Sequence, residues 1–147
     1  MGWRTELADQ VLARLSTLQV MGEPVAVERG QFDEQAPTIS ATDSRVRPYL
    51  VLWTTPGRRD ETQEDLGATS APLIWSFTVV AVGPDARTVD QLVDKVDPLL
   101  QFWRPTITGV SIDPIRSQWA GEPLAPSQNP VTTRFFAPLP YATTVGA

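Results

Sequence analysis

A single apolar stretch, PLIWSFTVVAVG at Pro72–Gly83, limits what this chain can fold into more than any other part of it. It is rich in aromatic and β-branched residues and ends at a Gly83-Pro84 breaker, which predicts a central β-strand. Side chains alternate along a strand, so this one has an apolar face and a mixed face: Leu73, Trp75, Phe77 and Val79 against Ile74, Ser76, Thr78 and Val80. We expect the apolar face to pack under helices and the mixed face to meet solvent or another subunit.

Two amphipathic stretches predict the helices that cover the apolar face. The first is residues 3–18, with apolar side chains at helical spacing: Trp3, Leu7, Val11, Leu15 and Leu18. The second is residues 88–102, with an N-cap at Asp85 or Thr88. Pro98 has no backbone N–H, so it should end or kink this second helix at the preceding residue.

Further strand-forming stretches predict a sheet around the central strand. They lie at residues 24–30, 48–54, 106–115 and 131–137. Gly109 is expected to mark a β-bulge in the third of them. Pro138 and Pro140 should end the last strand and leave residues 143–147 frayed.

The order of these elements predicts one domain over residues 1–147 with an α+β fold. The sheet should be single, antiparallel or mixed, with two main helices packed on one face. The polar residues 30–47 are expected to form a long connection, and residues 57–71 a projecting hairpin loop.

The chain contains no cysteine and no histidine. This excludes thiol nucleophiles, imidazole bases, Ser-His-Asp triads and Cys/His zinc sites. The neighbouring carboxylates fall on a predicted loop or on the polar side of a helix, where charged side chains are solvated: Asp60/Glu61, Glu64/Asp65 and Asp94/Asp97. We therefore expect no enzyme activity, no metal and no cofactor.

The charge and hydropathy patterns argue against two further classes of partner. Twelve basic and seventeen acidic residues give a net charge of −5, so the sequence lacks the basic footprint of a nucleic-acid-binding domain. No segment reaches the roughly 18 apolar residues of a membrane span, and no secretory signal is recognisable. We expect neither DNA binding nor a membrane location.

Two surfaces remain as candidate interaction sites. The first combines the mixed strand face with the second helix, and its candidate residues are Ile74, Ser76, Thr78, Val80, Asp90 and Asp94. The second is the charged hairpin loop, with Arg58, Arg59, Asp60, Glu61, Glu64 and Asp65. Such a loop is either a solvated hairpin tip or an arm that docks on a partner, and the sequence leaves both interpretations open.

The middle of the chain resembles a known family. The succession of Tyr49-Leu50-Val51-Leu52, a charged insert, the strand Leu73–Gly83 and the helical segment Ala86–Val96 is similar to the tail terminator, or tail-completion, proteins of long-tailed, non-contractile bacteriophages. The similarity is greatest to phages that infect actinobacteria. It covers about residues 48–116 and consists of a hydrophobic pattern.

This resemblance implies a structural protein without catalytic residues. Such a subunit would assemble as a homohexameric ring on the head-proximal end of the tail tube, stop tube polymerisation and offer a surface for head attachment. Its partners would be the major tail tube protein and a head-completion or neck protein, and DNA would pass through the lumen without specific binding. The protein would be assembled in the host cytoplasm and reside in the virion. Two alternatives remain, a head–tail connector or stopper protein of the neck, and a cellular α+β domain that binds a small apolar ligand.

Overall fold

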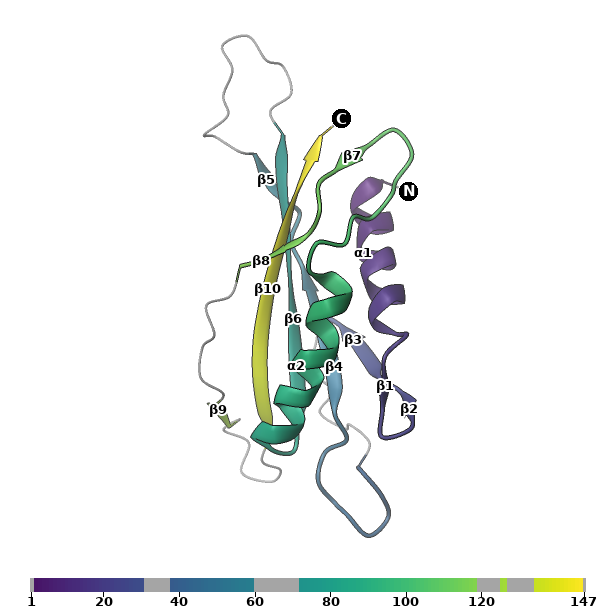
Figure 1. The fold of residues 1–147 in the computed structure, drawn as a ribbon, viewed down its shortest axis with the longest axis vertical. Coiled ribbons are helices and arrows are strands. Elements are labelled where there is room, and N and C mark those ends of the chain that lie inside the picture. The colour runs from purple at the N-terminus through teal and green to yellow at the C-terminus, as the bar shows by residue number, and fades with distance from the viewer. Residues whose placement is uncertain (1, 31–37, 60–71, 119–124, 127–133, 147) are drawn as a thin grey trace.

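The computed structural model describes residues 2–30, 38–59, 72–118, 125–126 and 134–146. Within them the elements are α1 (Trp3–Leu15), β1 (Gln19–Val20), β2 (Glu23–Pro24), β3 (Ala26–Arg29), β4 (Tyr49–Thr54), β5 (Arg58–Arg59), β6 (Leu73–Gly83), α2 (Ala86–Leu100), β7 (Ser111–Ile112), β8 (Arg116–Ser117), β9 (Ala125–Pro126) and β10 (Phe135–Gly146). Eight of these strands form one sheet in the order β3-β4-β6-β10-β7, with β5 beside β6 and with β8 and β9 beside β10. Only the β3–β4 pair among them is parallel. Both helices lie on one face of the sheet (Figure 1), so the predicted α+β fold is confirmed, with a mixed sheet.

Strand β6 is the centre of the fold, as its sequence predicted. It pairs with β4 on one edge and with β10 on the other. Trp75, Phe77 and Val79 are at most 1% exposed and lie in the core with the apolar stripes of α1 and α2. The ring centroids of Phe77 and Tyr141 of β10 stack 5.5 Å apart. The two-residue alternation therefore placed the apolar face correctly.

Both helices differ from the prediction at their ends. Helix α1 stops at Leu15 rather than at residue 18, because the hydroxyls of Ser16 and Thr17 donate back to carbonyls of the last turn and compete with helix continuation. Helix α2 begins after Asp85, which is the N-cap. It also continues through Pro98 to Leu100, so of the two predicted effects of this proline, an end or a kink, the structure excludes the end.

Pro98 is tolerated because the hydrogen bond that it removes lies on the solvent-exposed side of α2. A proline removes the N–H that would bond the carbonyl four residues earlier, here that of Asp94. Asp94 and Pro98 are both exposed, so water can satisfy that carbonyl. A later bond at the end of the helix is intact, since the N–H of Gln101 donates to the Asp97 carbonyl at 2.8 Å. The helix then ends where Phe102 adopts a φ of 64°.

The C-terminal segment differs from the prediction, because β10 continues to Gly146. Residues 143–146 are not frayed, because β10 pairs with β6 without a break from Phe135↔Gly83 to Val145↔Leu73. Pro138 and Pro140 leave the strand intact because their backbone nitrogens face the β8 edge and not β6. The Pro140 carbonyl accepts the Gln118 N–H at 2.8 Å on the β8 side. Pro138 faces the same edge by alternation, so neither missing N–H belongs to the β6 ladder.

The stretch 106–115 is mostly not a strand. Only Ser111–Ile112 joins the sheet, as β7. Ahead of it, Ile107 and Val110 bridge a tight turn in which Gly109 has a φ of 79°, so this glycine serves a turn and not the predicted bulge. The alternation of apolar residues reflects core anchoring, since Ile107, Ile112 and Ile115 are buried. By contrast, the predicted edge strand at residues 24–30 is present as β3.

The β4–β6 hairpin contains a bulge. The pairing moves from Thr54↔Phe77 to Arg58↔Ile74, which leaves one extra residue on the first strand. Gly57 lies in this bulge with a φ of 89°. Arg58 and Arg59 then continue the hairpin as β5, so they belong to the sheet and not to the predicted loop. The rest of that loop, from residue 60 to residue 71, lies outside the described residues.

Candidate functional site

The face of the sheet opposite the helices is the main candidate surface. Strand pairing places Thr78 between Trp53 of β4 and Pro140 of β10. We call this surface the outer face and define it by its partly or fully exposed side chains: Trp53, Ile74, Ser76, Thr78, Pro138, Pro140, Ala142 and Thr144. None of these eight side chains carries a charge, and Trp53 is 39% exposed. Two charged residues flank them on the same side of the sheet, Glu28 of β3 opposite Val51 and Arg58 of β5 opposite Ile74. The helices lie on the other side of the sheet (Figure 1).

Three of the predicted interface residues lie on the outer face and one does not contribute to it. Ile74, Ser76 and Thr78 are half-buried, as the mixed face of β6 predicted. Val80 points the same way but is only 6% exposed, because it belongs to a second apolar cluster. Val80 is therefore covered in this structure, and the role of these residues in a subunit contact stays a prediction.

The two predicted acidic interface residues lie on the opposite layer of the molecule. Asp90 and Asp94 are exposed on α2, away from the sheet. The structure therefore places three of the six predicted residues on the outer face and two on the helix layer, while Val80 is buried between sheet and strap.

The second apolar cluster is closed by a segment whose role the sequence did not reveal. We call residues 38–47 the strap. Val46 of the strap is 2% exposed and packs with Tyr49, Val51, Val80 and Val82 on the outer side of the sheet. On the side of the sheet away from the helices, the strap thus covers the end of β6 around Val80 and Val82. The outer face is the part of the same side that stays open, around Ile74, Ser76 and Thr78.

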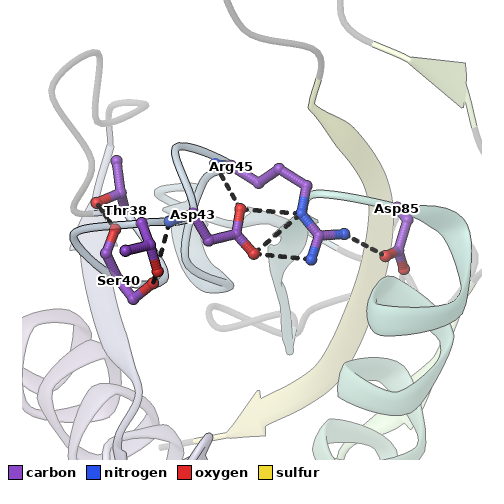
Figure 2. Close-up of polar contacts among 6 residues, drawn as sticks. Thr38, Ser40, Asp43, Arg45 and Asp85 are labelled. Carbon is purple, nitrogen blue, oxygen red and sulfur yellow. Dashed lines mark hydrogen bonds and ion pairs between the residues drawn. The ribbon is translucent and has the colours of Figure 1, made fainter.

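Polar contacts shape the strap and join it to α2 (Figure 2). Within the strap, the guanidinium of Arg45 binds the Asp43 carboxylate at 2.9 Å, and the Thr38 hydroxyl donates to the Ser40 carbonyl. Across to the helix, Arg45 Nη1 lies 3.5 Å from Asp85 Oδ2. The hydrogen bonds from Arg45 hold the pKa of Asp43 below its ordinary value.

Asp85 has two roles in this contact. Its other carboxylate oxygen accepts the Thr88 backbone N–H at 2.7 Å and caps α2. This hydrogen bond, helped by the charge of Arg45, lowers the pKa of Asp85. The sequence signal for an N-cap at Asp85 was recognisable, whereas nothing in the sequence linked it to Arg45, forty positions earlier.

The predicted docking loop is only partly described. Arg58 is exposed at the end of the outer face, opposite Ile74. The backbone of Arg59 pairs with Leu73. Asp60, Glu61, Glu64 and Asp65 lie outside the described residues, so the docking role of this loop stays a prediction.

The described residues offer little that resembles a catalytic or ligand site. They contain no group of three or more acidic, histidine or cysteine side chains that could hold a metal ion. Of the carboxylate pair on α2, Asp94 faces solvent and Asp97 accepts the Tyr141 hydroxyl at 2.9 Å, a bond that ties α2 to the sheet.

A small cavity lies between the β1–β2 hairpin and α2. It has a volume of about 100 Å³ and is lined by Val20, Met21, Pro48, Thr88, Gln91, Leu92 and Lys95. Ligand pockets usually enclose roughly 300–1,000 Å³. This cavity is therefore a poor fit for the small-ligand alternative. Across the described ranges, neither helix has the length and apolar character needed to cross a membrane.

Comparison with known proteins supports the architecture alone. No family model and no curated protein matches the sequence. Among solved structures, one chain that carries only a sequence identifier as its name matches with a TM-score of 0.55 and 15% identity. The match covers 99% of this chain and 91% of the other. At this identity the likeness shows a shared α+β fold over nearly the whole length and carries no function.

Proposed function

We propose that this protein is a phage tail terminator, which assembles as a ring on the head-proximal end of the tail tube, stops its growth and presents a surface for head attachment. The observation that carries the proposal is the outer face. Its centre is formed by apolar, proline and hydroxyl side chains of β4, β6 and β10, and charged residues lie only at its margins among those described. The resemblance of the hydrophobic pattern in residues 48–116 supports the choice of family, and the outer face offers a place for subunit contact.

The composition of the outer face supports contact with another subunit. Its partly exposed side chains on β6 run from Ile74 to Thr78, five positions or roughly 16 Å of strand. A stable interface buries about 800 Å² on each partner, so a neighbour would contact this patch together with the surface around it. The occupant we assign to it is a second copy of this chain.

The separation of the two candidate surfaces supports a ring. A two-fold dimer joins the same patch on both partners, whereas a closed ring joins two different patches. Here Ile74, Ser76 and Thr78 lie on the sheet side, and Asp90 and Asp94 lie on the helix side. In the proposed ring, the outer face of each copy meets the α2 surface of its neighbour, and the positive charge of Arg58 at the end of the outer face is complementary to the acidic Asp90 and Asp94.

The experiment that tests the proposal is tube capping with the substitution Thr78→Arg. Thr78 is half-buried at the centre of the outer face, and an arginine there can extend into solvent, so the isolated subunit should lose no more than about 0.5 kcal/mol of stability. A ring contact at this position would bury the new charge and fail. The matched control is Thr108→Arg, at an exposed position in the turn before β7.

Tail tubes assembled from the major tail tube protein of the same phage, with its length-determining proteins, would be measured by negative-stain electron microscopy. Wild-type protein and Thr108→Arg should give tubes of one length, and Thr78→Arg should give overgrown tubes. Normal capping by Thr78→Arg would contradict the assignment of the outer face. Failure of the wild type to bind tubes would contradict the terminator function and favour a neck protein, which would instead bind the head connector.

A further inference from the structure

The strap, residues 38–47, divides one continuous surface of the sheet into a covered part and an open part. Thr78 and Val80 both point to the outer side of β6 and are neighbours on that side. Thr78 is half-buried on the outer face, whereas Val80 and Val82 are buried in a cluster that contains Val46 of the strap and against which Phe136 also packs. Removal of the strap would uncover the side of this cluster that Val46 closes and extend the outer face by apolar surface.

The strap has few polar contacts with the rest of the molecule. Arg45 pairs with Asp85, and Arg47 donates to the Val20 carbonyl at 3.1 Å and pairs with Glu23 at 3.2 Å. Most of its hydrogen bonds are internal, such as that from the Ile39 N–H to the Arg45 carbonyl at 3.0 Å. Val46 is its one fully buried side chain. A segment with one buried anchor and an otherwise exposed backbone can open at a lower free energy than the whole domain unfolds.

Arg45 is placed to act as the latch of this segment. The internal bond to Asp43 orients its guanidinium, and the bond to Asp85 connects the strap to the first turn of α2. The Arg45 side chain is 58% exposed and that of Asp85 is 45% exposed. Exposed ion pairs of this kind contribute little stability, so the latch is weak enough to be released by a competing contact.

We propose that the strap is a reversible cover, latched by Arg45 and Asp85, whose opening enlarges the surface on which a second copy of this chain docks. This inference rests on the proposed function, because the second copy is the occupant assigned to the outer face. In the closed form the apolar cluster around Val80 and Val82 is hidden, which limits premature association. In the open form the same cluster becomes available to the arriving subunit.

The test measures opening directly through single cysteines. The chain contains no cysteine, so an introduced thiol is the only one present. Val82→Cys places the thiol beneath the strap, and Val79→Cys places it on the helix-covered face of the same strand. Labelling with a thiol reagent under native conditions should be much faster for Val82→Cys, because only that site is exposed when the strap opens.

The latch is tested by adding Asp85→Asn to each cysteine variant. Asparagine is as good an N-cap as aspartate, so α2 should remain capped while the ion pair with Arg45 is lost. Labelling of Val82→Cys should then accelerate up to about fivefold, the factor that corresponds to a surface ion pair. Labelling of Val79→Cys should not change, and Asp90→Asn, which removes a charge elsewhere on α2, should affect neither site.

Two results would overturn the proposal. Equal labelling rates for Val82→Cys and Val79→Cys would mean that the cluster is exposed only by global unfolding. An unchanged rate with Asp85→Asn would mean that Arg45 does not latch the strap. Neither result depends on tube capping, so the strap and the terminator function can fail separately. If both hold, cysteine-free Asp85→Asn should cap tubes at up to about fivefold lower protein concentration than the wild type.

Discussion

The effect of a proline on the stability of this protein should depend on which edge of β10 it faces. A proline introduced at position 139 should destabilise the fold, whereas the prolines at positions 138 and 140 are tolerated. In the structure, Pro138 and Pro140 direct their missing N–H groups toward the β8 edge, where the Pro140 carbonyl accepts a bond from Gln118. Leu139 faces the other edge and is paired with Val79 of β6. Its N–H therefore belongs to the central ladder of the sheet.

The size of the effect follows from the environment of these residues. Leu139 is 3% exposed, so Leu139→Ala should cost about 2–5 kcal/mol through lost packing. Leu139→Pro should cost about 1–3 kcal/mol more, because the buried carbonyl of Val79 loses its donor. Pro138→Ala, at an exposed position, should change stability by no more than about 1 kcal/mol.

The assay is urea and thermal unfolding of the purified variants, followed by circular dichroism. For a chain of 147 residues, 1 kcal/mol corresponds to a change in melting temperature of about 2–4 °C. The comparison that decides is Leu139→Pro against Leu139→Ala, since both lack the leucine side chain. Equal stability of these two variants, or a large loss in Pro138→Ala, would refute the edge assignment of β10.

Three further predictions concern single contacts. Tyr141→Phe keeps the buried ring but removes its hydrogen bond to Asp97, and it should lower the free energy of unfolding by about 1.5–3 kcal/mol in urea titrations. If the stability losses of Tyr141→Phe and Asp97→Asn simply add in the double mutant, the two side chains are not in direct contact. Gly57→Ala should cost about 1–2 kcal/mol, because φ is 89° and the added Cβ would lie 3.2 Å from the Ile74 carbonyl oxygen; an unchanged melting temperature would exclude the bulge geometry. Asp85 has a lowered pKa in the folded state, so its contribution is fully present above its ordinary pKa of 3.8 and is lost as pH falls through the lowered value. The stability difference between wild type and Asp85→Asn should therefore shrink between pH 6 and pH 2.5, and a constant difference would argue against the assignment.

The sequence alone determined the centre of the fold. The two faces of β6 and the apolar stripes of the two helices were predictable, because alternation and helical periodicity are properties of neighbouring residues. The same local pattern gave the fold class and located Ile74, Ser76 and Thr78 on the open side of the sheet. The N-cap at Asp85 was one of two local alternatives, and the structure selected it.

Only the tertiary structure decided the rest, because those features depend on which residues meet across the chain. A proline ends a strand or is tolerated according to the edge that its missing N–H faces, and the sequence of β10 does not state that edge. Likewise, Val80 has the same alternation as Thr78, yet it is buried in a cluster that Val46 of the strap and Phe136 of β10 help to close. The contact of Arg45 with Asp85 joins two distant segments through the packing of the strap against α2, and no local pattern encodes such a meeting.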